Sequence, residues 1–411
     1  MIELLRSFLR SLAHFSRSFW SANVSELFER IAFYGMTPVL VRYLTASRGF
    51  GDAQAIRLSG NFGLVVYGLP VLSGFLADLM GYRRAMMLAY ALLALGYLLV
   101  GNATHYWPIA GSLLLVALGA SLIKPTITGT VQRTCAEAQR PVGFSIYYTL
   151  VNIGGFIGPN LSGQVSNLRG ARSVFWCSAG SVVVALIVVL ALFREPPSQV
   201  GLERKSVTAF LRQFLHVVAS PRLVLLFLFV AGFWSLFFQF FGAFTLYLGN
   251  DLGLSQGNAN LVISLDALAV IAFQVIVGYL TRNAATSRAI FAAALVSSAG
   301  IALIGLHRSV PFAAAGVLVF AVGEMIYSAH FYHYLGDIAP PGQVGLCMGF
   351  AFLPIALGSF LAGQIGGPIS LYFRDSLRWP EGMWFAFAAV GFVSAAGLAV
   401  LTFLFKPKTP G

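Results

Sequence analysis

Residues 26–36 read Glu-Leu-Phe-Glu-Arg-Ile-Ala-Phe-Tyr-Gly-Met, and they lie inside the otherwise apolar stretch 19–44. Three ionisable side chains, Glu26, Glu29 and Arg30, therefore fall within a segment that is typical of a membrane-spanning helix, and Lys124 falls within a second one. A charge buried in lipid costs at least ~2.5–3.5 kcal/mol on insertion scales. These four residues predict a functional interior rather than a wall that faces lipid.

The composition predicts an all-α integral membrane protein. The chain is 58% hydrophobic and 10% charged, whereas soluble domains carry about 25% charged residues. Apolar stretches of about 20 residues predict helices. We expect twelve of them, near 19–44, 57–79, 84–103, 108–132, 144–168, 171–193, 222–249, 258–280, 287–306, 311–336, 344–371 and 381–405.

The net charge of +12 is a signal of membrane topology and does not follow a nucleic-acid-binding pattern. Of the 26 Lys and Arg residues, 16 fall in loops on the side of the two termini and eight on or near the other side. The positive-inside rule then places both termini in the cytoplasm, as an even helix count requires. The stretch before Trp20 is basic and broken, so we expect no removable signal peptide, and we expect a bacterial inner-membrane location.

Several function classes lack support in the sequence. Cys135, Cys177 and Cys347 are too far apart to indicate a disulfide framework. There is no phosphate-binding glycine loop for ATP, and no nucleophile–base or metal-ligand constellation that predicts an enzyme. We therefore expect no metal and no cofactor, with transport energy supplied by an ion gradient or by the gradient of the substrate itself.

The polar segment 194–221 divides the chain into two halves of similar length. It contains three prolines and several basic residues. We predict an N-terminal six-helix bundle at 1–193, a cytoplasmic linker at 194–221 and a C-terminal six-helix bundle at 222–411. Within the linker, 210–218 is compatible with a short interfacial helix or with plain linker.

The loop between the second and third predicted helices carries a motif of a known superfamily. Residues 74–84, Gly-Phe-Leu-Ala-Asp-Leu-Met-Gly-Tyr-Arg-Arg, resemble the G-x-L-a-D-r-x-G-r-r motif of the major facilitator superfamily (MFS), with Leu79 in place of an arginine. The resemblance implies the MFS fold of twelve helices in two bundles. Asp78, Arg83 and Arg84 would form a gating latch, or would only anchor the helix end.

Further motifs narrow the resemblance to one family of transporters. Residues 26–36 resemble the ExxER-F-x-YYG signature of the proton-dependent oligopeptide transporter (POT) family, and Ile123-Lys124-Pro125 resembles its helix-4 lysine. Matches to its helices 5, 7 and 10 to 11 begin at Phe144, Phe233 and Gly323. The resemblance implies a proton-coupled secondary transporter of small peptides or peptide-like solutes that works by alternating access and has no cofactor. Its partners would be the solute and the bilayer, and we expect a monomer.

The charged residues are candidates for proton coupling. Glu26, Glu29 and Arg30 share one helix face, so we expect Arg30 to pair with Glu26 and to leave Glu29 free for Lys124. The alternative is a static ion-pair network that only holds the bundle together. Asp266 and Glu324 have no base nearby in sequence, which suits proton carriers; the resemblance implies that Glu324 pairs with Lys124.

The same resemblance supplies the substrate-binding candidates. Aromatic residues would form cavity walls or ordinary packing, and polar residues would bind the ligand. The full set is Tyr34, Thr37, Tyr67, Lys124, Asn152, Trp234, Gln239, Asp266, Glu324, Tyr327 and Ser328. His330 and His333 end the tenth helix, where a pH response, a metal site or interfacial packing are the alternatives.

Three departures from the family pattern fall on the candidate site. Thr37 stands where the family has the arginine that clamps a peptide carboxylate, and Thr cannot replace that bidentate contact. Phe238 replaces the protonatable helix-7 glutamate, and Asp266 stands near the position of an asparagine. A transporter or exporter of cationic or amine-bearing molecules or drugs is therefore the alternative, beside a non-transporting sensor.

Overall fold

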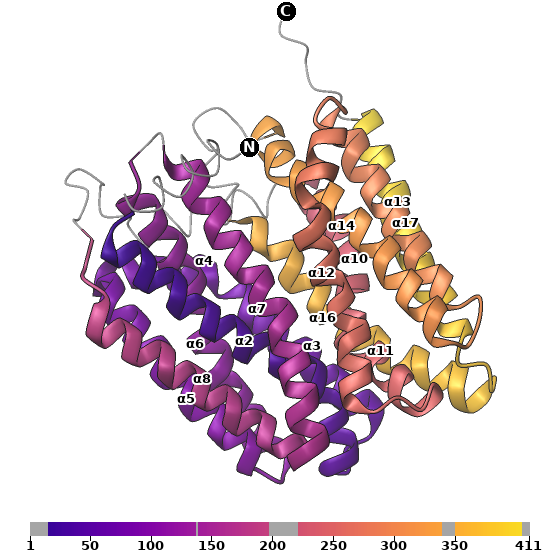
Figure 1. The fold of residues 1–411 in the computed structure, drawn as a ribbon. Helices are drawn as coiled ribbons and strands as arrows, with labels where there is room; N and C mark the ends of the chain where they lie inside the picture. The colour runs from indigo at the N-terminus through magenta and orange to yellow at the C-terminus, as the bar shows by residue number, and fades with distance from the viewer. Residues whose placement is uncertain (1–14, 137–138, 197–220, 339–349, 405–411) are drawn as a thin grey trace, which may run out of the picture.

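A computed structural model describes residues 15–136, 139–196, 221–338 and 350–404, and every element in these ranges is helical (Figure 1). The first half contains α2 (Arg17–Arg42), the π-turn η1 (Tyr43–Ser47), α3 (Asp52–Gly68), α4 (Pro70–Met80), α5 (Tyr82–Asn102), α6 (Tyr106–Thr134), α7 (Arg140–Arg169) and α8 (Ala171–Leu192). The second half contains α10 (Pro221–Gln239), α11 (Ala243–Leu246), η3 (Tyr247–Asp251), α12 (Gln256–Thr281), α13 (Thr286–Ile304), α14 (Val310–Ile338), η4 (Phe350–Phe352), α16 (Leu353–Leu371), η5 (Tyr372–Ser376) and α17 (Gly382–Leu404).

The predicted all-α membrane fold is confirmed. Within the described ranges, nine helices are long and apolar enough to cross a membrane, and the bent pair α3–α4 makes a tenth. The two further long helices, α2 and α7, carry more polar residues, because α2 holds the charged cluster and α7 holds several Ser, Asn and Gln side chains. Helical segments thus occupy all twelve predicted ranges.

Two predicted helices are interrupted, and both breaks have local causes. The second span bends by 51° between Gly68 and Leu72, at Pro70, because proline removes a backbone donor and crowds the preceding turn. The seventh span leaves helical geometry between Gln239 and Ala243, where Gly242 has φ −115° and ψ −100°. Helix α4 ends and α5 begins on either side of Gly81, whose φ of 84° is a conformation that favours glycine.

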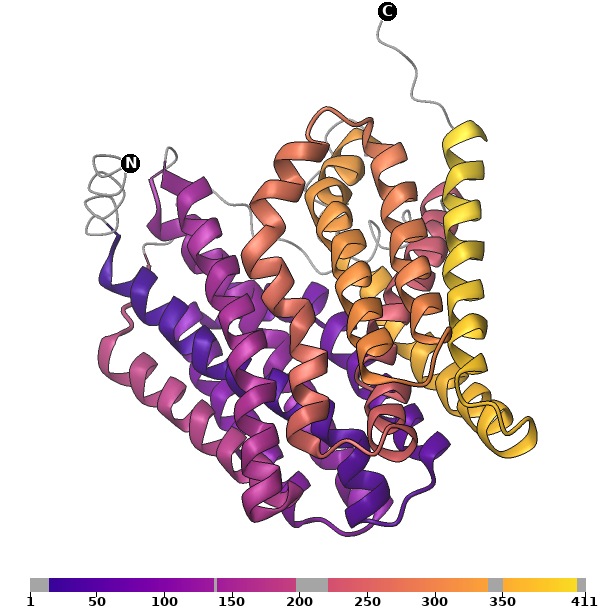
Figure 2. The ribbon, with the colours of Figure 1, turned by 45° about the vertical axis from the view of Figure 1, so that its right-hand side comes forward.

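The helices form two groups that meet along two seams. α2 to α8 pack on one another, α10 to α17 do the same, and the pairs α3–α16 and α7–α12 join the groups. We call the face where α2 begins and α17 ends the terminal face, and the opposite one, where α2 ends and α3 begins, the distal face. Figures 1 and 2 show α7 and α12 side by side toward the distal face and apart toward the terminal face. Most of the predicted linker, 197–220, lies outside the described residues.

The distal face is closed by close backbone contact. At Gly60 in α3, an added Cβ would lie 2.5 Å from the Gly363 Cα of α16, and at Gly163 in α7 it would lie 2.8 Å from the Gly257 Cα of α12. Small residues allow such approach in membrane proteins. Among the described residues, hydrogen bonds such as that from Asn260 Nδ2 to the Pro159 carbonyl (2.8 Å) also join the halves on this side.

Candidate functional site

The charged residues of α2 form one buried cluster. Arg30 Nε lies 2.5 Å from Glu29 Oε2 and 3.1 Å from Glu26 Oε1, and all three residues are at most 5% exposed. The expectation that Arg30 pairs with Glu26 and leaves Glu29 free is therefore wrong, because the guanidinium contacts both carboxylates. With both acids ionised the cluster carries a net charge of −1, so one proton or one further cation neutralises it.

Lys124 on α6 is that further cation, but it makes no salt bridge with Glu29 or Glu324 in the described part of the chain. It is near enough to attract Glu26 and Glu29 electrostatically. Its Nζ lies 4.7 Å from the ring centroid of Phe352 and 5.9 Å from that of Tyr67. Aromatic faces attract an ammonium group without fixing it, so the predicted pairings of Lys124 are not present in this conformation. Because Phe352 belongs to η4, this contact crosses between the halves.

Asp266 on α12 and Glu324 on α14 are partners of each other. Their carboxyl groups lie close enough to interact with each other, and Asp266 Oδ1 and Glu324 Oε2 are buried without a hydrogen-bond partner in the described structure. Two neighbouring carboxyl groups can form a hydrogen bond with each other only when one of them carries a proton. The pairing was not predicted from the sequence, because residues 58 positions apart on different helices give no local signal.

Two of the three departures from the family pattern lie in the same small cavity. Thr37, Tyr34 and Tyr67 from the first half line a space of about 20 Å³ with Phe238 and other residues of the second half. The rings of Tyr67 and Phe238 are 5.5 Å apart, and the Thr37 hydroxyl donates to the Tyr34 carbonyl of its own helix at 3.5 Å. The cavity is therefore aromatic, with no cation where the resemblance expects an arginine.

The remaining binding candidates have local partners. Trp234 Nε1 donates to the Tyr327 hydroxyl at 3.2 Å, Asn152 Nδ2 donates to the Tyr148 carbonyl at 2.9 Å, and the Ser328 hydroxyl donates to the Glu324 carbonyl at 2.5 Å. Gln239 is 1% exposed and donates to the Ala362 carbonyl of α16. Gln239 thus supports helix packing in this conformation, whereas the other roles stay predictions.

The predicted latch has other partners than Arg83 and Arg84. Asp78 accepts hydrogen bonds from Arg133 Nη2 at 2.8 Å and from the Tyr82 hydroxyl at 3.0 Å. The carboxylate of Glu195 caps the start of α5 by accepting from the Tyr82 and Arg83 amides, both at 2.7 Å. Sequence reasoning missed Arg133 and Glu195, which lie 55 residues beyond Asp78 and 112 beyond Arg83.

The structure does not test the metal-site alternative for His330 and His333 as a pair. His330 is buried at 7% exposure, and the side chain of His333 lies outside what the structure describes. No group of three or more His, Cys, Asp or Glu that could hold a metal ion occurs among the described residues.

Comparison with known proteins agrees with this geometry. Residues 23–363 match the sequence model of the Major Facilitator Superfamily. The chain therefore belongs to this superfamily.

The individual relatives are peptide permeases. The chain is 31% identical over 176 residues to a dipeptide and tripeptide permease A of Cronobacter turicensis. This alignment covers 42% of the present chain and 35% of the relative. The permease of the same name in Escherichia coli is 30% identical over 167 residues, covering 39% and 33%. The matched part thus spans about a third of the length of these relatives.

Solved structures share the whole fold. A POT family transporter in complex with 5-aminolevulinic acid has a TM-score of 0.78 at 18% identity, over 93% of this chain and 96% of that one. The peptide transporter POT in complex with sulfate has a TM-score of 0.78 at 19% identity, over 94% of both. The expected MFS fold is confirmed over nearly the full chain.

Proposed function

We propose that this protein is a POT-type, proton-coupled transporter that moves small peptides or peptide-like solutes by alternating access. The observation that carries the proposal is the buried Glu26–Glu29–Arg30 cluster, which carries a net charge of −1 when both acids are ionised. It lies near Lys124, whose ammonium group makes no salt bridge among the described residues. A movable cation beside a cluster that one proton neutralises links proton binding to a change of contacts. The names of the permeases similar to this chain support the solute class.

In this mechanism the bundles 1–193 and 222–411 rock against each other. The segment 194–221 connects them, and no cofactor takes part. Lys124 changes partners: with an ionised cluster it is drawn toward Glu29, and after protonation it is released toward Glu324 in the other half. Asp266 and Glu324 hold the second exchangeable proton, because two neighbouring buried carboxyl groups avoid repulsion when they share one proton. Asp78, Arg83 and Arg84 act at the terminal face as the gating segment.

The solute binds between the halves. Tyr34, Tyr67, Trp234 and Tyr327 supply aromatic surface, and Asn152, Ser328 and Lys124 supply polar contacts. We propose a monomer in the bacterial inner membrane with both termini in the cytoplasm, since most basic loops lie on the terminal face. The distal face is then the outer one.

Cationic or amine-bearing solutes are the second candidate, favoured by the acidic pair and by Thr37. Two adjacent carboxyl groups attract an ammonium group, and the cavity beside Thr37 has no guanidinium to bind a carboxylate. A solute that presents an amine without a carboxylate would fit this charge pattern better than a peptide does.

Uptake by proteoliposomes under an imposed inward proton gradient tests the proposal. Di- and tripeptides are compared with a panel of organic amines, each with and without a protonophore. Peptide accumulation that collapses with the protonophore supports the first candidate, and movement of amines alone supports the second. Equal uptake with and without the gradient for every solute would overturn proton coupling.

A further inference from the structure

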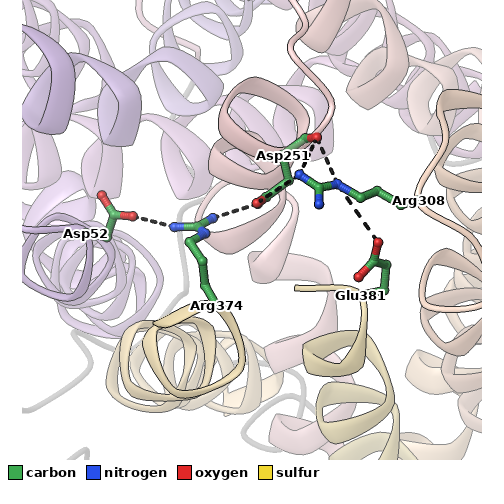
Figure 3. A network of polar contacts seen from close by, with 5 residues as sticks. All are labelled: Asp52, Asp251, Arg308, Arg374 and Glu381. Atoms are coloured by element: carbon green, nitrogen blue, oxygen red, sulfur yellow. Dashed lines mark hydrogen bonds and ion pairs between the residues drawn. The ribbon is translucent and has the colours of Figure 1, made fainter. Parts of the chain in front are cut away.

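A chain of charged residues crosses the distal face and takes no part in the site above. Figure 3 shows Arg374 of η5 between two carboxylates. Its Nη1 lies 2.7 Å from Asp52 Oδ2 and its Nη2 lies 2.8 Å from Asp251 Oδ2. Asp52 begins α3 in the first half, whereas Arg374 and Asp251 belong to the second half. The Asp52–Arg374 pair therefore joins the two bundles.

The pair is sheltered from solvent. The side chains of Arg374, Asp52 and Asp251 are 18%, 21% and 6% exposed. Hydrogen bonds between ionised groups at this distance are stronger than neutral ones, and partial burial limits screening by salt. The contact is thus stronger than a fully exposed ion pair, which contributes little.

A second arginine holds the arrangement in place. Arg308, in the loop between α13 and α14, donates to the Asp251 carbonyl through Nε at 3.0 Å and Nη2 at 2.9 Å. It also lies 3.8 Å from Asp251 Oδ1 and 3.9 Å from Glu381 Oε1. All of these contacts stay within the second half. Arg308 fixes Asp251, and Asp251 in turn aims Arg374 at the first half.

Both partners of the crossing pair keep a favourable environment when it breaks. Arg374 retains Asp251 within its own bundle. Asp52 lies in the first turn of α3, where the helix dipole favours a negative charge. When the Asp52–Arg374 contact breaks, neither charge is left without a stabilising partner. Such a contact can form and break between two conformations of a transporter.

We propose that the Asp52–Arg374 ion pair is a lock that holds the distal face closed, with Asp251 as the positioning residue for Arg374. Opening of the distal face separates Asp52 from Arg374, while Arg374 and Asp251 move together with the second bundle. The lock sets the population of the distal-open state and does not itself bind solute or transported protons. The proposal of this lock does not depend on which solute the protein carries.

Thiol labelling of the distal seam tests the lock. Ser359 of α16 is 1% exposed, and its hydroxyl donates to the Gly60 carbonyl across the seam at 3.3 Å. Ser359→Cys is introduced into a chain whose three native cysteines are replaced, and the protein in nanodiscs is treated with a membrane-impermeant maleimide. The labelling rate then follows the distal-open population. Loss of a charge-assisted contact of this kind changes an equilibrium about tenfold, so Arg374→Gln and Asp52→Asn should each raise the rate by about that factor.

Controls separate the lock from general loosening. Arg378→Gln removes an exposed guanidinium four residues away that has no salt bridge in the described structure, and it should leave the rate unchanged. Because both single variants break the same contact, Asp52→Asn should add nothing in the Arg374→Gln background. Arg374→Lys should restore part of the slow rate, and size-exclusion profiles verify folding.

Two outcomes would overturn the proposal. One is that correctly folded Asp52→Asn and Arg374→Gln both label at the parent rate. The other is that their effects multiply in the double variant, which would mean that the two residues act separately. Since the assay contains neither solute nor proton gradient, failure of the proposed transport function would leave its result unaffected.

Discussion

Gly60→Ala should open the distal face, because the new methyl group has no room in the closed conformation. An ideal Cβ at Gly60 lies 2.5 Å from the Gly363 Cα, 2.8 Å from the Gly363 amide nitrogen and 2.7 Å from the Ser359 carbonyl oxygen. These are backbone atoms of α16, so no side-chain rotation relieves the overlap. To reach an ordinary contact of 3.4 Å, α3 and α16 must separate locally by about 0.9 Å.

The cost of that separation falls on the closed state alone. Overpacking of a close contact costs typically ~1–3 kcal/mol, and in a distal-open state α3 and α16 no longer touch at this point. The substitution should therefore shift the conformational equilibrium toward the open state by about 5- to 150-fold. The Ser359→Cys labelling rate described above measures this shift, and a distance between spin labels on Gly51→Cys and Ser376→Cys measures it independently.

The matched control is Gly68→Ala in the same helix. There an added Cβ lies 3.8 Å from the Ala356 Cβ, which is an ordinary contact, so labelling should stay at the parent rate. Both substitutions replace a glycine of α3 by alanine, Gly60 inside the helix and Gly68 at its last residue. The gain in helix propensity at Gly60 stabilises the closed and open states alike, so it does not shift the equilibrium between them. A folded Gly60→Ala variant that labels no faster than Gly68→Ala would refute the argument that backbone contact closes the distal face.

Three further predictions concern the charged interior. Lys124→Ala should abolish gradient-driven uptake and spare solute exchange, because the other solute contacts remain but the movable cation is lost; undiminished accumulation would contradict the partner change. Arg30→Met should destabilise the protein by ~3–5 kcal/mol, since two buried carboxylates lose their cation. Glu26→Gln with Glu29→Gln should restore most of that loss in thermal unfolding, and no restoration would mean that Arg30 acts through packing. Asp266→Asn should weaken inhibition of uptake by organic amines about tenfold, while competition by N-acetylated peptides, which lack the ammonium group, changes little. Equal loss for both would argue against an ammonium site.

The helices were predictable because lipid imposes one rule on every span. A segment of about 20 apolar residues has to satisfy its backbone internally, so it forms a helix wherever it occurs. The predicted range 171–193 and the observed Ala171–Leu192 differ by one residue. The interruption at Gly242 was not predicted, because flanking phenylalanines keep the segment apolar and only its backbone angles reveal the break.

The pairings were less predictable than the positions. Charged residues within one span were predictable from the sequence, because Glu26, Glu29 and Arg30 are costly to bury in lipid and lie close together in the chain. Which atoms they contact depends on side-chain geometry, so Arg30 reaching both carboxylates was missed. Partners such as Asp266 with Glu324, or Asp52 with Arg374, come from helices that only the packed bundle brings together.

Two departures from the family pattern, Thr37 and Phe238, remove charges from the cavity between the halves, whereas the proposed distal lock places an ion pair elsewhere. Thr37 and Phe238 replace an arginine and a glutamate expected from the resemblance, and both line the same aromatic cavity between the halves. An arginine at position 37 would face this aromatic surface, where burying its charge without a carboxylate is costly. The halves are nevertheless joined by an ion pair farther toward the distal face, where Arg374 contacts Asp52. In the proposed mechanism the ion pair that holds the closed state is thus separate from the solute site, so solute selectivity near Thr37 can change without loosening the distal closure.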